Sequence, residues 1–345
     1  MARFASEAGS FLVEAGCFDQ VGQCSLGMLS RNLHRASRWP RGAAENLLMS
    51  QCAFIEFGST TIKYYLLEDD GCEICIQEEI KVPWKLGHEV FGQSAISLGT
   101  IHRALASIEE LKGRFPNVPL LYAVGTAALR EAENAADFER AVWNRLQLKI
   151  RVVDGGVEAS ALETGFKKTI SEYPSTLFDL GGGSLEIVEL ESPSRTIRTS
   201  LPVGAIRFHC MLNLNPLIGL SSYATASHRL LKRVCLEHGW QRANDLPLVF
   251  ATGGTAQTIA QIAESATFDR EVVRRIIDDI QHVRSRSDIE PHRRQVLLAG
   301  ALIVDGLFEE FEVDAIEYRK IPTRLTAFDW IEGSPTPDAA REVNG

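Results

Sequence analysis

The sequence has few of the features that mark membrane proteins, disulfide-stabilised proteins or general nucleic-acid binders. No apolar run approaches the roughly 18 residues that a membrane-spanning helix needs. The seven cysteines among 345 residues are odd in number and scattered, which fits reduced thiols better than a disulfide framework. The net charge of -9 argues against a general nucleic-acid binder but leaves phosphorylated small molecules open as ligands. We therefore expect a cytoplasmic protein with no membrane partner and no specific nucleic-acid partner.

The length and composition are those of a globular chain with about two domains. Hydrophobic residues make up 45% of the sequence, which is enough apolar material for real cores. Residues 1–50 differ, because their arginines are clustered and no uninterrupted apolar stretch follows a basic start. We interpret them as a weakly ordered extension, with a transit-type role as the minority alternative. Domains are expected at 51–172 and 173–333, the last helix of the second docking on the first, with a tail at 334–345.

Two halves of the sequence follow the same order of predicted elements. Residues 52–82 alternate as three short strands, and a helix at 95–112 and further strands and helices follow. Residues 175–204 again predict three strands. Each half begins with an apolar strand, an acid, glycine and a hydroxyl residue, in IEFGSTT from Ile55 and in FDLGGGS from Phe178. The repeat predicts a mixed α/β fold of two similar domains whose loops face a shared ligand.

Local signals place the later elements of the first half. Asn134 precedes the helical pattern in NAADFERAVWNRL and is expected to cap that helix. The stretch LKIRVVDGG at 148–156 is expected to form a strand, and another helix is expected to begin at Glu158. An acid in a first helical turn is common because it offsets the helix dipole. Glu158 therefore has a purely structural explanation as well as a functional one.

Three loops rich in glycine and hydroxyl residues have the composition of phosphate-binding loops. Successive backbone N–H groups of such a loop can converge on one point and bind phosphate oxygens without a cationic side chain. The third loop, in FATGGTAQTIA from Phe250, also opens a helix, whose N-terminus favours anions. A single glycine loop is more often only a tight turn, but three together indicate a polyphosphate or a nucleotide. The candidate phosphate-binding residues are Gly58, Ser59, Thr60, Gly181, Gly182, Gly183, Ser184, Gly253, Gly254 and Thr255.

Acidic residues stand beside these loops. Glu56 precedes the first loop, and Asp179 and Glu186 flank the second on two strands joined by the glycine turn. Carboxylates suit Mg²⁺, which is usually held by one or two of them together with phosphate and water. The sequence therefore predicts a Mg²⁺ site formed by Asp179, Glu186 and Glu56.

Five motifs in chain order make the sequence similar to a known family. VGTAALREAENAADF, VDGGVEASALETGF, FDLGGGSLEIVEL, SLPVGAIRF and ATGGTAQTIA resemble those of the Ppx/GppA phosphatase family, over about residues 52–330. The resemblance implies two RNase H-like domains of the actin, Hsp70 and sugar-kinase superfold with a cleft between them. It also implies removal of terminal phosphate from inorganic polyphosphate or from guanosine pentaphosphate (pppGpp), usually with Mg²⁺. The chain is similar to short members that lack a C-terminal HD-type domain, and members are often homodimers.

The resemblance also implies roles for particular residues. Glu158 matches the family's general base, which fits the need for a carboxylate to orient and deprotonate water attacking a polyanion. Arg130 matches a phosphate-contacting arginine, and a guanidinium fork suits phosphate. Arg207 matches a family arginine whose role the sequence does not give, and a structural ion pair is an equal alternative. Lys63, Lys85 and Arg207 are further candidates for holding a long anionic chain.

Two departures from the family pattern keep other functions open. Glu56 replaces the family's usual aspartate, Thr60 replaces its asparagine, and IPTRL at 321–325 keeps only Arg324 of the usual C-terminal turn. We expect a phosphoanhydride hydrolase that acts on polyphosphate or pppGpp. One alternative is a catalytically weakened protein that binds polyphosphate or guanosine tetraphosphate. Another is a sugar kinase or ATPase of the same superfold.

Overall fold

The computed structural model describes residues 51–69, 74–84, 86–212, 220–240, 247–281 and 291–321. Across these ranges, no helix combines the length and the apolar character needed to cross a membrane. The segments 1–50 and 322–345, and with them Arg324, lie outside the described residues, as does Lys85.

The first sheet has five strands in the order β3-β2-β1-β4-β5. They are β1 (Gln51–Phe57), β2 (Thr61–Asp69), β3 (Ile74–Pro83), β4 (Leu120–Gly125) and β5 (Ile150–Val152). β1 to β3 form an antiparallel meander, and β4 and β5 continue from β1 as parallel strands. The expected three-strand start of this half is confirmed.

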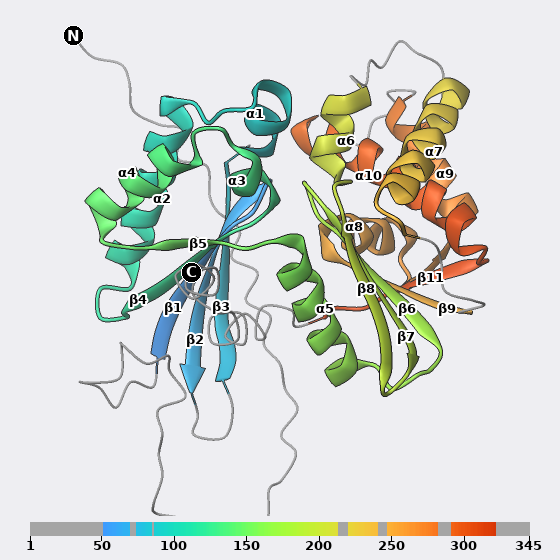
Figure 1. Ribbon diagram of the computed structural model, residues 1–345, viewed down its shortest axis with the longest axis horizontal. Coiled ribbons are helices and arrows are strands. Elements are labelled where there is room, and N and C mark those ends of the chain that lie inside the picture. The colour runs from blue at the N-terminus through green and yellow to red at the C-terminus, as the bar shows by residue number, and fades with distance from the viewer. Residues whose placement is uncertain are drawn as a thin grey trace, which may run out of the picture. The chain divides into compact units, whose positions relative to one another are not determined.

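The second sheet repeats this arrangement and adds one strand at its edge (Figure 1). Its strands are β6 (Ser175–Leu180), β7 (Leu185–Ser192), β8 (Arg195–Leu201), β9 (Leu248–Thr252), β10 (Thr267–Asp269) and β11 (Ala315–Tyr318). Their order is β10-β11-β9-β6-β7-β8, with β6 to β8 antiparallel and β9 and β11 parallel to β6. Strands β8-β7-β6-β9-β11 thus correspond one by one to β3-β2-β1-β4-β5, and the predicted duplication of a mixed α/β unit is confirmed.

Four helices accompany the first sheet: α1 (Leu86–Gln93), α2 (Leu98–Arg114), α3 (Ala127–Glu131) and α4 (Ala135–Leu146). An aromatic group of Phe57, Trp84 and Phe138 is buried where β1 meets α4, with ring centroids 5.2–5.6 Å apart. Phe57 is the last residue of β1, so this packing fixes the point at which the first glycine loop begins.

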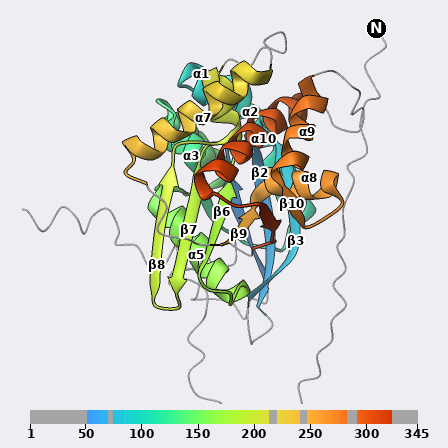
Figure 2. The ribbon, with the colours of Figure 1, turned by 90° about the vertical axis from the view of Figure 1, so that its right-hand side faces the viewer.

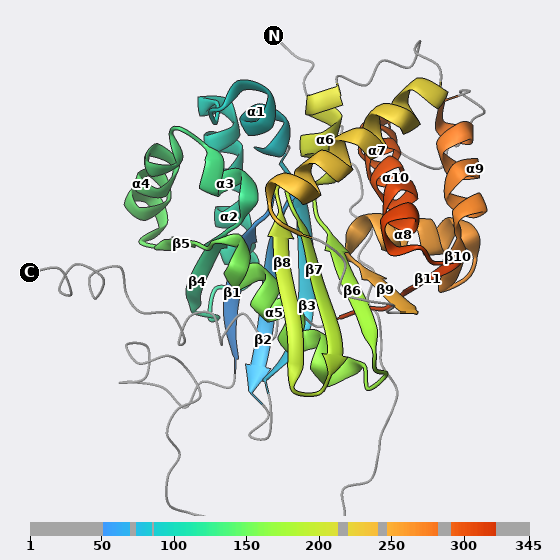
Figure 3. The same cartoon turned by 45° about the vertical axis from the view of Figure 1, so that its right-hand side comes forward.

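The helix α5 (Gly155–Thr169) covers one face of the second sheet, although it follows β5 of the first (Figures 1 and 3). Its apolar side chains Leu162 and Phe166 pack with Leu177 of β6 and Val188 of β7. Because successive strand residues point to opposite faces, the neighbouring Phe178 joins a core on the other face. The site-bearing strands β6 and β7 are therefore buried on both sides.

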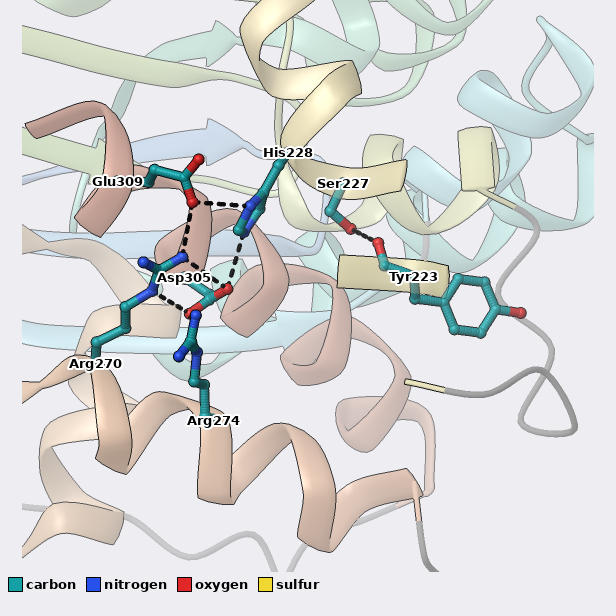
Figure 4. Close-up of polar contacts among 7 residues, drawn as sticks. All are labelled: Tyr223, Ser227, His228, Arg270, Arg274, Asp305 and Glu309. Atoms are coloured by element: carbon teal, nitrogen blue, oxygen red, sulfur yellow. Dashed lines mark hydrogen bonds and ion pairs between the residues drawn. The ribbon is translucent and has the colours of Figure 1, made fainter. Parts of the chain in front are cut away.

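The opposite face of the second sheet carries the remaining helices (Figures 2 and 3). They are α6 (Ala205–Leu212), α7 (Leu220–Glu237), α8 (Gly253–Ala263), α9 (Arg270–Gln281) and α10 (Pro291–Phe311). Figure 4 shows a charged cluster that joins three of them. Asp305 of α10 is in contact with His228 of α7 and with Arg270 and Arg274 of α9, and Glu309 contacts His228 and Arg270. This cluster links α7, α9 and α10 by polar contacts beside their shared apolar core.

Two local predictions need correction. Asn134 stands at the N-cap position of α4 but makes no capping hydrogen bond with its side chain. Its amide instead bonds the backbone N and O of Ile96, at 2.8 and 2.9 Å, because this tertiary contact competes for the same polar atoms. The strand expected at 148–156 is only Ile150–Val152. Asp154 ends it by accepting a hydrogen bond from the N–H of Val157 at 2.9 Å and so capping α5.

Candidate active site

The first glycine loop is a tight turn between β1 and β2, held by its carbonyl groups. The N–H of Gly58 donates to the carbonyl of Thr61 at 3.1 Å. The carbonyl of Gly58 accepts from the indole N–H of Trp84 at 2.7 Å, and the carbonyl of Thr60 accepts from the backbone N–H of Trp84 at 3.3 Å. The carbonyl of Ser59 accepts from the N–H of Gly87 at 2.8 Å. Three consecutive carbonyls are thus fixed from the α1 side, which sets the conformation of the loop backbone.

The second glycine loop, between β6 and β7, is held in the same way by the start of α6. The N–H groups of Ala205 and Ile206 donate to the carbonyls of Gly181 and Gly182, both at 2.9 Å. The side chain of Arg207 donates from Nε to the carbonyl of Gly183 at 2.7 Å. The first N–H groups of a helix have no partner within it, and here the loop supplies their acceptors. This helix start therefore holds the loop in place.

The first and second glycine loops approach each other closely. A Cβ atom on Gly182 would lie 2.6 Å from Oγ1 of Thr60, and one on Gly183 would lie 2.6 Å from Oγ of Ser59. No side chain fits in that space, so glycine is required at both positions for the loops to approach each other. The two loops thus lie next to each other, while the ligand that they are expected to share stays a prediction.

The third loop begins α8 on the strand next to β6. Gly253 has a φ of +89°, which favours glycine, and a Cβ there would collide with Oδ1 of Asp179. Thr252 occupies the N-cap position without a capping hydrogen bond from its side chain. Gly254 is exposed and Thr255 is buried. The first turn of α8 therefore starts beside Asp179 with a helix N-terminus that suits an anion.

Three carboxylates act on one another electrostatically beside these loops. Burial raises the pKa of Glu186 well above its ordinary value, and the negative charges of Glu158 and Asp179 raise it further. Hydrogen bonds from Ser184 and Ser200 oppose that rise, and Oγ of Ser200 lies 2.8 Å from Oε1 of Glu186. Asp179 of β6 and Glu186 of β7 are cross-strand partners. The start of α5, the helix that carries Glu158, lies against Ser200, which bonds Glu186. Such a cluster of negative charge favours a cation.

Arg130 lies next to the candidate base. Its Nη1 is 2.8 Å from Oε1 of Glu158 and 2.5 Å from the carbonyl oxygen of Val153. The side chains of both charged partners are largely buried, with 27% and 13% of their surface exposed. The family resemblance implies a phosphate contact for Arg130, and the structure places its guanidinium at Glu158, the candidate base.

Glu56 is buried and is bonded by two side chains of the neighbouring strand β2. Its Oε1 accepts from Nζ of Lys63 at 3.0 Å, and its Oε2 accepts from the hydroxyl of Tyr65 at 3.3 Å. Lys63 is its cross-strand partner in β2. Lys63, a candidate for holding an anionic chain, is thus paired with Glu56, a candidate metal ligand. Both roles stay predictions.

Several residues that shape the site are absent from the predicted set. Ser200 orients Glu186, and Gly155 at the start of α5 lies so close to Ser200 that a Cβ there would meet its hydroxyl. Glu131 pairs with Arg207 through both carboxylate oxygens. Ser200 and Glu131 both lie inside motifs of the family resemblance, in SLPVGAIRF and VGTAALREAENAADF, but the resemblance gave neither of them a role. Pairing between distant segments is not visible in one sequence.

Comparisons with known proteins agree with this fold. A profile of the Ppx/GppA phosphatase family matches residues 68–324. A Haemophilus influenzae protein named "Putative exopolyphosphatase" is 24% identical over 290 residues, 78% of this chain and 87% of that protein. A guanosine-5'-triphosphate,3'-diphosphate pyrophosphatase of Pseudoalteromonas translucida is 23% identical over 289 residues, 76% of this chain. The match spans only 55% of the latter protein.

A crystal structure of an exopolyphosphatase from Cytophaga hutchinsonii has the same fold. Its TM-score is 0.70 at 14% identity, and the match covers 83% of this chain and all of that one. The expected superfold of two RNase H-like units is thereby confirmed. The family profile covers most of the chain and includes both glycine loops of the second half and the candidate base. The chain therefore belongs to the Ppx/GppA phosphatase family.

Proposed function

We propose that this protein is a hydrolase that releases terminal orthophosphate from inorganic polyphosphate or pppGpp. The observation that carries the proposal is the pairing of Asp179 with Glu186 beside the second and third glycine loops, with the start of α5, which carries Glu158, packed on the Ser200 that bonds Glu186. A polyanion needs many hydrogen-bond donors, which the loops and the start of α8 supply, and a base for water, which Glu158 supplies. Family membership and the names of its relatives support the same reaction class.

In this mechanism, the glycine loops bind and orient the terminal phosphates. Arg130 fixes the carboxylate of Glu158 through the 2.8 Å contact, so that its oxygen is held for the attacking water. Glu158 accepts the proton of that water as oxygen attacks phosphorus, and the bond to the leaving phosphate oxygen breaks. Ser200 keeps Glu186 in a fixed orientation beside the loop. Positioning and charge, more than covalent chemistry, supply the rate enhancement in phosphoryl transfer.

We propose Mg²⁺ as the cofactor, held by Asp179 and Glu186. The mutual repulsion of these acids and Glu158 fits a divalent cation, because a bound cation removes the cost of gathering negative charge. Within the described ranges, no three His, Cys, Asp or Glu side chains form a ready-made cage. Mg²⁺ suits such a site, since it is usually bound by one or two carboxylates with substrate phosphate and water. When bound, it would neutralise charge on the phosphates.

The test compares wild type with Glu158→Gln, measuring orthophosphate release from long-chain polyphosphate and separately from pppGpp, with and without Mg²⁺. The substitution keeps size and hydrogen bonding but removes the base, so we expect a loss of about a hundredfold or more. The matched control is Glu163→Gln on the same helix, where Glu163 pairs with Lys167 and Arg198. We expect that control to keep its activity.

One second candidate has a specific observation behind it. Glu56, in place of the family's aspartate, is engaged by Lys63 and Tyr65, which favours a protein that binds the anion without turning it over. If wild type binds polyphosphate or pppGpp at saturating Mg²⁺ but releases no phosphate from either, this second function replaces the hydrolase. Release that requires a nucleotide or a phosphoryl acceptor would instead indicate a kinase or ATPase.

A further inference from the structure

Arg207 connects the two halves of the protein at the second glycine loop. It belongs to α6, and its backbone N–H donates to the carbonyl of Gly182 at 3.1 Å. Its Nε donates to the carbonyl of Gly183 at 2.7 Å, and its Nη1 and Nη2 bind the two carboxylate oxygens of Glu131 on α3. The guanidinium carbon also lies 4.2 Å from the ring centroid of Phe91 on α1. One side chain thus touches a phosphate loop and two helices of the other half.

The burial of the arginine distinguishes this contact from an ordinary surface ion pair. Only 12% of the Arg207 side chain is exposed, although 39% of the Glu131 side chain is. Pairs in which both partners are solvated contribute little. The planar guanidinium presents its donors as a fork, so it can meet a carboxylate at one edge and a carbonyl at another while stacking on a ring. Lysine offers one charged nitrogen and makes no such three-way contact.

Glu131, the partner of Arg207, lies next to the residue that contacts the candidate base. Glu131 directly follows Arg130 in the short helix α3, and Arg130 holds Glu158. Gly183 packs so closely on Ala127 and Phe91 that a Cβ would lie 2.8 and 2.7 Å from them. The loop, α3 and the base are therefore joined by a continuous set of contacts.

We propose that Arg207 is a positioning residue that fastens the Gly181–Gly183 loop to α3. The distance between that loop and the Arg130–Glu158 pair is thereby held constant. Phosphates bound by the loop then lie at a fixed distance from the base. The inference rests on the proposed hydrolase function for its effect on rate, but the fastening itself can be measured without turnover. A displacement of about 1 Å in such a site can cost on the order of a hundredfold in rate.

The kinetic test uses Arg207→Lys, Arg207→Met, Glu131→Gln and the double variant Arg207→Met with Glu131→Gln. We expect kcat to fall at least about tenfold in each, with KM changed less than about threefold. The double variant should lose no more than Arg207→Met alone, because both remove the same contact. The matched control is Arg198→Met, which removes an ion pair with Glu163 between β8 and α5. We expect that control to keep wild-type kcat.

A measurement independent of turnover is hydrogen–deuterium exchange of peptides that cover Gly181–Ser184 and Gly58–Thr60. We expect faster exchange of both loops in the Arg207 variants and wild-type exchange in Arg198→Met. Full activity in Arg207→Lys, or a rise in KM at unchanged kcat, would overturn the proposal, the latter because it shows direct substrate binding. An inactive wild type would contradict the hydrolase function but not the fastening of the loop. Unchanged hydrogen exchange in the Arg207 variants would overturn the fastening itself.

Discussion

Nη1 of Arg130 lies 2.8 Å from Oε1 of Glu158, and the two residues come from helices that pack in different halves of the protein. Arg130 belongs to α3 beside the first sheet, and Glu158 belongs to α5, which covers the second. The same nitrogen also donates to the carbonyl of Val153, at the end of the segment that leads into α5. Glu158, the candidate base, is thus positioned by a charged side chain of the other half as well as by its own helix.

Substitution of Arg130 should reveal how much of the rate depends on this contact. We expect Arg130→Met to lower kcat/KM about a hundredfold, the usual cost of removing one charge-stabilising donor from such a site. Arg130→Lys should recover part of that loss, because it keeps the charge but cannot donate in the geometry of a fork. Phosphate release from polyphosphate measures both. The exposed pair Arg140–Asp137 gives a control in Arg140→Met, and full activity in Arg130→Met would contradict the expectation.

Gly253 offers a test of the third loop. With a φ of +89° and Oδ1 of Asp179 in the space of a Cβ, Gly253→Ala must move either the loop or the acid. We expect a loss of activity of about a hundredfold, together with a loss of stability of about 1–3 kcal/mol from the backbone strain. Gly239→Ala separates the two effects, since Gly239 has a φ of +66° but nothing within 4 Å of the position that a Cβ would take. It should lose stability and keep its rate.

The first loop invites the reverse experiment, restoring the family's aspartate. Glu56→Asp shortens the side chain by about one C–C bond, roughly 1.5 Å, and pulls it away from Lys63 and Tyr65. Because these partners are mostly buried, we expect a loss of stability of about 1–3 kcal/mol, seen as a lower melting temperature, and no gain in kcat. A higher kcat at unchanged melting temperature would show that Glu56 weakens the site, and would favour the binding protein over the hydrolase.

The sequence was most informative where residues close together in the chain determine the local structure. Alternating apolar residues, glycine turns and their repetition were enough to predict both meanders and the repeat of one α/β unit. It was less informative where partners are distant in the chain. The side chain of Asn134 bonds Ile96 instead of capping its helix, and Arg207 binds Glu131 across 76 positions. Likewise, α5 follows the first sheet in sequence but packs on the second. Such choices depend on the assembled fold and on no local signal.

The final prediction concerns stability away from the site, at the buried Asp305 shown in Figure 4. Its oxygens lie 2.7 Å from Nε of Arg270, 3.0 Å from Nε of Arg274 and 2.8 Å from Nε2 of His228. Burial alone would raise the pKa of Asp305, but the hydrogen bonds from His228 and Arg270 and the charges of both arginines hold it well below its ordinary value. The folded protein therefore favours the ionised form.

The sign of the pH dependence follows from that lowered pKa. An unfolded aspartate has a pKa of about 3.9, so the contribution of Asp305 to stability is complete above about pH 4 and is lost as the pH falls from there towards its folded pKa. We expect Asp305→Asn to lower the free energy of unfolding by about 1–3 kcal/mol near pH 7, because it removes the buried charge that Arg270, Arg274 and His228 share as a hydrogen-bond acceptor. Asp137→Asn, in an exposed pair, should change it by less than about 1 kcal/mol. Thermal melting between pH 3 and 7 would measure the stability of both proteins. The difference in melting temperature between wild type and Asp305→Asn should narrow below about pH 4. A gap that stays constant with pH would mean that the cluster stabilises the helical layer by packing and not by charge.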